Sequence, residues 1–65
     1  MKYHMLKEVT DYGDNIKGGI YIFDKKPKGR TMEMVGYIGP KTDEVKWFTN
    51  GFKIDTKGRQ FVQVN

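Results

Sequence analysis

Four basic side chains crowd into one short segment, the clearest group in this sequence that could do chemistry. Lys25, Lys26, Lys28 and Arg30 lie within KKPKGR, which contains no acidic residue. Ammonium and guanidinium groups bind phosphate oxygens. The chain has 12 Lys and Arg against 8 Asp and Glu, so its net charge of +4 equals the charge of this segment. The segment predicts either a cationic turn that grips phosphates or a solvated turn that aids solubility.

Aromatic side chains near lysines would add base stacking, worth about 1–3 kcal/mol per unpaired base. Phe48 lies between Lys46 and Lys53, and Tyr21 and Phe23 lead into the basic segment. The competing interpretation is that these rings only fill the core. The residues expected to bind nucleic acid are Lys25, Lys26, Lys28, Arg30, Lys46, Phe48, Lys53, Tyr21 and Phe23.

Other reactive groups are sparse. The chain has no serine or cysteine, the two commonest nucleophiles. Its single histidine, His4, is near a terminus, and Asp43-Glu44 is the only adjacent pair of carboxylates. No segment has metal-ligand spacing or a phosphate-loop pattern. We therefore expect no enzymatic activity, no metal and no cofactor.

The composition is typical of strands. Among 65 residues there is no alanine and only one leucine, and the apolar residues are mostly Ile, Val, Met and aromatic. The absence of cysteine suits a reducing compartment. No apolar run approaches the roughly 20 residues of a membrane span, and the N-terminus lacks a signal-peptide core. We expect one soluble, cytoplasmic domain over residues 1–65 that does not enter a membrane.

The stretch Val45–Asp55 contains two alternating runs separated by Asn50-Gly51. Asn-Gly favours a two-residue type I′ turn, because both central residues take positive φ. The pattern predicts a hairpin with Trp47 facing Ile54 in the core and Lys46 facing Asp55. The alternative is a short helix that Thr42 caps and that runs through Val45–Thr49.

Four other segments resemble strands. Gly19–Asp24 is apolar on both faces, and Thr31–Ile38 contains Gly36, which suggests a bulge or bend. Arg59–Val64 follows an expected turn at Thr56–Gly58. Lys2–Tyr12 favours a strand, although its apolar residues also have helical spacing. Loops are expected over residues 13–19 and 39–44.

These elements predict an all-β fold, a five- or six-stranded antiparallel meander curled into an SH3-like or OB-like barrel. Alternate turns of a meander share one end, so we expect KKPKGR beside Asn50-Gly51 and near Lys53. The expected core is Leu6, Val9, Ile20, Ile22, Val35, Ile38, Val45, Trp47, Ile54 and Val62.

The last third of the chain resembles the opening strands of a cold-shock domain. The segments that carry the resemblance are Val45–Phe48 (VKWF), Gly51–Ile54 (GFKI) and Phe61–Val64 (FVQV). That family binds single-stranded nucleic acid on exposed aromatic side chains, which implies that Trp47 lies outside. Lys53 replaces one of its aromatic residues, Gln63 replaces its histidine, and the family has these strands at its beginning.

Two classes of function follow. The first is a small basic β-domain that binds DNA or RNA through the cationic turn and the neighbouring lysines and aromatic residues. The alternative is a protein-interaction module, such as a small phage-type inhibitor or adaptor. It would use an apolar patch or an edge strand, which could also form a homodimer.

Overall fold

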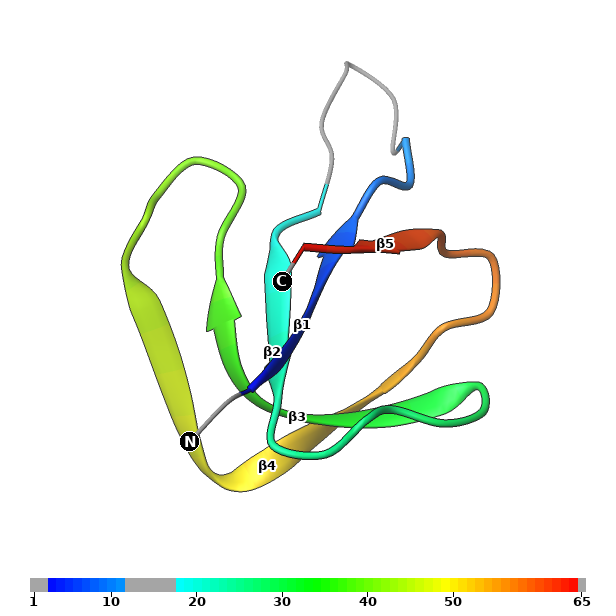
Figure 1. Ribbon diagram of the computed structural model, residues 1–65. Coiled ribbons are helices and arrows are strands. Elements are labelled where there is room, and N and C mark those ends of the chain that lie inside the picture. The colour runs from blue at the N-terminus through cyan, green and yellow to red at the C-terminus, as the bar shows by residue number, and fades with distance from the viewer. Residues whose placement is uncertain (1–2, 12–17, 65) are drawn as a thin grey trace.

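The computed structural model describes residues 3–11 and 18–64, in which the regular elements are strands. They are β1 (His4–Glu8), β2 (Ile20–Phe23), β3 (Thr31–Ile38), β4 (Val45–Asp55) and β5 (Phe61–Gln63). All five lie in one antiparallel sheet with the order β4-β3-β2-β1-β5 (Figure 1). The all-β, five-stranded antiparallel prediction is confirmed. The described residues include no helix long and apolar enough to cross a membrane.

The sheet curls because β3 and β4 bend together (Figure 1). The core lies on its inner face, where Tyr21, Phe23, Met32 and Met34 are buried. Leu6, Tyr37, Phe48, Ile54 and Phe61 pack around them. The sheet is nevertheless open: within the described residues β4 pairs only with β3 and β5 only with β1. The expected closure into a barrel is not seen.

The predicted hairpin at Asn50-Gly51 is wrong. β4 continues through both residues, and its two halves pair with the same neighbour, β3. Met34 pairs with Phe52 and Gly36 pairs with Trp47, so a step of two residues along β3 matches five along β4. Asn50-Gly51 therefore belongs to a large bulge that turns the corner of the sheet. Gly51 does have the expected positive φ, at 76°.

The altered register changes several expected contacts. Lys46 pairs with Tyr37 instead of Asp55, and Asp55 lies opposite Thr31. Trp47 is 55% exposed, so its expected place in the core is wrong. The helix alternative over Val45–Thr49 is also wrong, since these residues are strand.

The remaining predictions, on core residues, strands and turns, are confirmed in part. Ile22 is buried as expected, whereas Val45 and Val62 are exposed. The strand interpretation of the N-terminal segment is confirmed over His4–Glu8, and the irregularity near Gly36 appears as a register shift after Met34. The turn before β5 is present. Most of the predicted loop over residues 13–19 lies outside the described residues.

Candidate nucleic-acid interface

The basic loop, residues 24–30, connects β2 to β3. Lys25, Lys26 and Lys28 are exposed and make no ion pair with another described residue. Arg30 differs, because its Nε lies 3.3 Å from Asp55 Oδ1. The Arg30 carbonyl also accepts hydrogen bonds from the Thr56 backbone N–H at 2.8 Å and from Thr56 Oγ1 at 2.6 Å. The end of the loop is thus fixed to the end of β4, while its three lysines face solvent.

This anchoring corrects the expected position of the loop. It does not share a corner with Asn50-Gly51, because no turn forms there. It lies instead where β1 begins, β5 ends and β4 ends, because it shares a hollow with His4 and Gln63 and forms the Arg30–Asp55 ion pair.

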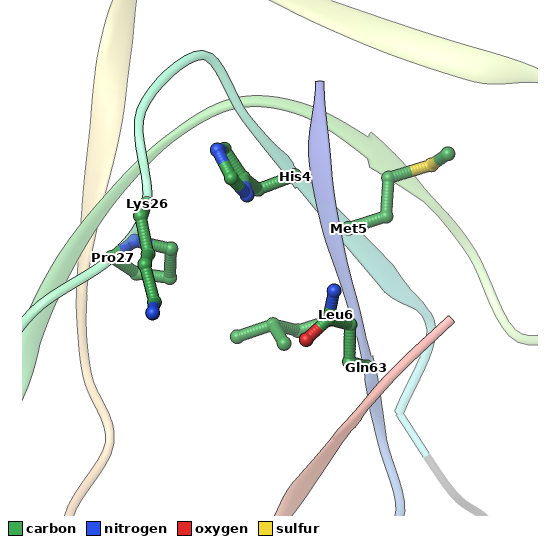
Figure 2. Close-up of a pocket in the computed structure, with 6 residues that line it drawn as sticks. All are labelled: His4, Met5, Leu6, Lys26, Pro27 and Gln63. Carbon is green, nitrogen blue, oxygen red and sulfur yellow. The ribbon is translucent and has the colours of Figure 1, made fainter. Parts of the chain in front are cut away.

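A hollow of about 300 Å³ adjoins the basic loop. Its lining comes from β1, β5 and the loop, and consists of His4, Met5, Leu6, Lys26, Pro27 and Gln63. In Figure 2 the His4 ring projects from β1 toward the loop, and the Gln63 amide projects from β5 toward Leu6. We refer to this site as the His4 hollow.

A second hollow, of about 230 Å³, contains the indole of Trp47. Its other lining residues are Tyr3, Asp24, Val35 and Phe48. The rings of Tyr3 and Trp47 have centroids 5.5 Å apart and a tilted arrangement, within the range of favourable aromatic pairs. Trp47 is therefore held by a neighbour while more than half of it remains open to solvent. We call this site the Trp47 hollow.

Both hollows border the start of the basic loop, because Asp24 lines one and Lys26 lines the other. Tyr3 and His4 are consecutive, and successive side chains of an extended chain point to opposite faces. The two hollows are therefore lined by neighbouring residues of the N-terminal strand segment, and Lys25 lies between their loop residues in the sequence.

Of the other expected site residues, only Phe48 is brought here, as part of the lining of the Trp47 hollow. Lys53 lies opposite Glu33, and Lys46 lies beyond the bulge in the other half of β4. Phe48 is half-buried and packs against the core. Tyr21 and Phe23 were wrongly expected to stack on bases, since only 7% and 1% of them are exposed. They face inward because their register partners on β1, Leu6 and His4, lie on the inner face of the curled sheet.

Sequence reasoning missed Trp47 and Phe52 as exposed rings, at 55% and 50%. The false hairpin register concealed both. The resemblance to the cold-shock opening strands was the one signal that indicated an outward Trp47.

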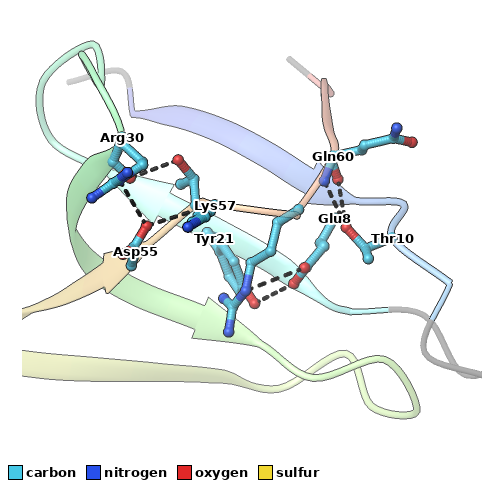
Figure 3. Close-up of polar contacts among 9 residues, drawn as sticks. Glu8, Thr10, Tyr21, Arg30, Asp55, Lys57 and Gln60 are labelled. Carbon is cyan, nitrogen blue, oxygen red and sulfur yellow. Dashed lines mark hydrogen bonds and ion pairs between the residues drawn. The ribbon is translucent and has the colours of Figure 1, made fainter.

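Sequence reasoning also missed a polar cluster around Glu8, whose side chain is only 1% exposed. Tyr21 donates a hydrogen bond to Glu8 Oε1 at 2.6 Å, and Arg59 Nε lies 3.7 Å from Oε2 (Figure 3). Gly18 covers the carboxylate so closely that a Cβ there would collide with it. Burial, followed by the hydrogen bond and charge of Glu8, raises the pKa of Tyr21 well above its ordinary value.

This cluster joins three parts of the sheet: Glu8 ends β1, Tyr21 is in β2 and Arg59 precedes β5. A second set of bonds reinforces the same end, because the Thr10 hydroxyl accepts from the Gln60 backbone N–H at 2.6 Å (Figure 3). Glu8 therefore secures β5 against β1, and its enclosure leaves no open position for a substrate.

The described residues contain no group of three His, Cys, Asp or Glu side chains arranged to hold a metal. No protein-family model, curated protein or solved structure matches this chain.

Proposed function

We propose that this domain binds single-stranded nucleic acid, DNA or RNA, at the basic loop and the two hollows beside it. The observation that carries the proposal is the position of Lys25, Lys26 and Lys28. These exposed lysines have no ion pair with an acidic side chain among the described residues. They follow Asp24, which lines the same hollow as Trp47, a tryptophan that is 55% exposed. Cationic groups beside an open aromatic ring can bind the backbone and stack a base.

The proposed binding residues have two different roles, which follow from their side-chain chemistry. Lys25, Lys26 and Lys28 bind phosphate oxygens, and Trp47 stacks on an unpaired base. Arg30 contributes less, because Asp55 already neutralises it. Lys53 lies opposite Glu33 and Lys46 lies opposite Tyr37, so both belong to the periphery of the surface. Phe48 lines the Trp47 hollow beside Asp24.

The test is the salt dependence of binding to labelled single-stranded oligonucleotides, measured by fluorescence anisotropy. Each phosphate contact contributes about 0.7 to the log–log slope for a single strand. Replacing Lys25, Lys26 and Lys28 together by Gln should lower the slope by about 2.

The matched control replaces Lys7, Lys41 and Lys57 by Gln. These three lysines are also exposed, so the net charge falls equally while the basic loop is intact. The control should keep most of the affinity. Equal losses in both triple variants, or an affinity that does not change with salt, would contradict the proposal.

Trp47 provides an independent measurement because it is the only tryptophan in the chain. Stacking should quench its fluorescence as oligonucleotide is added. Trp47→Ala should weaken binding by about 1–3 kcal/mol. Phe52→Ala removes another exposed ring of β4 that lines neither hollow, and should have a smaller effect.

A second candidate function, a protein-interaction module, is favoured by the outer face of the sheet. Trp47, Val45 and Val62 are exposed there. The register places Ile38, Ile20 and Lys7 in a row between Val45 and Val62, so the row is apolar except for Lys7. Exposed apolar patches often bind partners. Capture of one specific protein that survives nuclease and high salt would favour this function over nucleic-acid binding.

We also infer that the sheet is a partly open small barrel of the SH3-like or OB-like kind. The support is the strong bend of β3 and β4 and the return of β5 to the side of β1 (Figure 1).

A further inference from the structure

We propose that the His4 hollow is a nucleotide subsite that takes one unstacked base of the bound strand and the phosphate beside it. The inference rests on the proposed function, since the strand must first bind at the basic loop. It adds a second base-binding position, separate from Trp47, and a means of distinguishing one base from another.

The first argument is the shape and chemistry of the lining. Leu6 from β1 and Pro27 from the basic loop give the hollow apolar lining, and both are half-buried. Leu6 also packs against the core, so its position is fixed by the fold. The His4 ring projects from the same strand as Leu6 toward the loop that carries Pro27 (Figure 2). A base is flat and apolar on its faces, and such rings stack on histidine and on apolar side chains.

The second argument is the pair of polar groups at the two sides of the hollow. The amide of Gln63 carries both a donor and an acceptor, the combination that matches the hydrogen-bonding edge of a base. Lys26 lies on the opposite side, on the basic loop (Figure 2). Its ammonium group can bind the phosphate while Gln63 contacts the base.

The third argument is charge. None of the described residues that line the His4 hollow is acidic. The Trp47 hollow contains Asp24, and a hollow beside Tyr37 contains Glu44. Lys25 and Lys28 also flank the Lys26 and Pro27 of the His4 hollow in the sequence, so of these three hollows it is the best suited to hold a phosphate of the bound strand. Its volume, about 300 Å³, is at the lower end for ligand sites, which suits a single nucleotide.

The experiment compares Gln63→Ala and Gln63→Glu with Gln60→Ala and Gln60→Glu. Gln60 is an exposed glutamine immediately before β5 whose described hydrogen bonds use its backbone. Affinities for the four homopolymeric DNA oligonucleotides are measured for each variant, with circular dichroism to verify folding. Gln63→Glu retains the shape of the side chain, so it remains informative if Gln63→Ala is unstable.

We expect Gln63→Ala to weaken binding of the preferred homopolymer about fivefold, as the loss of one hydrogen bond predicts, and to level the preference among bases. Gln63→Glu should weaken binding further, because its charge repels the phosphate. Neither Gln60 variant should change the preference. In the wild type, the ring-proton signals of His4, the single histidine, should shift when oligonucleotide is added.

Two results would overturn the subsite, and they are distinguishable. If the wild type binds strands but the Gln63 variants keep its base preference and the His4 signals do not move, the subsite is wrong and the proposed function stands. If the wild type binds none of the four oligonucleotides, both fail.

Discussion

Trp47 lies directly over Gly36, its register partner on β3. A Cβ built on Gly36 would come within 2.9 Å of Trp47 Cε3 and 3.3 Å of Ile22 Cδ1. The missing side chain at Gly36 thus gives the indole its place on the outer face, and the indole in turn covers Ile22, which is only 3% exposed.

Gly36→Ala should therefore push the indole outward. The added methyl group overfills the contact, and we expect a stability loss of about 1 kcal/mol, the low end for overpacking, because the half-exposed ring can move. Tryptophan emission should shift to the red and oligonucleotide affinity should fall. Gly39→Ala is the control, since its Cβ would meet Thr42 and Tyr37 instead. Unchanged emission in Gly36→Ala would show that the glycine does not position the ring.

Tyr21→Phe tests the buried cluster. Phenylalanine fills the same space but removes the hydrogen bond to Glu8, whose carboxylate is enclosed. A hydrogen bond to a charged group is worth about 1.5–3 kcal/mol, so urea unfolding should show a loss of that size. Tyr37→Phe is the matched control, because its ring stacks against Tyr21 at 5.1 Å and no hydrogen bond of its hydroxyl is described. Equal losses in both variants would argue against a special role for Glu8.

The raised pKa of Tyr21 predicts alkaline instability. Above about pH 10 the unfolded chain releases the Tyr21 proton while the folded chain retains it, so stability is complete below that pH and declines above it. The contribution of this one group approaches about 1.4 kcal/mol per pH unit. The difference in unfolding free energy between wild type and Tyr21→Phe should shrink from pH 9 to 11. A constant difference would be inconsistent with the shift.

Asn50-Gly51 illustrates what local sequence does and does not specify. The pair correctly indicated positive φ at Gly51, but both a type I′ turn and a bulge use that conformation. The choice depends on β3, whose eight residues are long enough to pair with both halves of β4. The pairing register between β3 and β4 decided between the turn and the bulge. The residues of Val45–Asp55 alone do not specify that register.

The core and the site depended on the same long-range register. Strand periods were readable, so four of the predicted strand segments overlap β1, β2, β3 and β5. The inward face of β2 could not be read from the sequence, because both faces of this strand are apolar. In the structure Tyr21 faces inward to meet Glu8, and Ile22 faces outward under Trp47. The cationic loop was evident from charge alone. Its neighbours, His4 and Gln63, come from opposite ends of the chain.

Asp55→Asn should strengthen nucleic-acid binding by releasing Arg30. The Arg30–Asp55 pair is exposed, with 66% and 58% of the side chains accessible, and such pairs contribute at most about 1 kcal/mol. Asparagine can still accept the hydrogen bond that the Lys57 backbone N–H donates to Asp55 Oδ1 at 2.9 Å, so the turn should persist. We expect a gain of up to about fivefold in affinity and an increase of about 0.7 in the salt slope, which corresponds to one added phosphate contact. Asp43→Asn adds the same charge in the exposed loop between β3 and β4, so it controls for net charge. If the two variants gain equally in anisotropy titrations, then overall charge accounts for the effect and Arg30 is not a phosphate ligand.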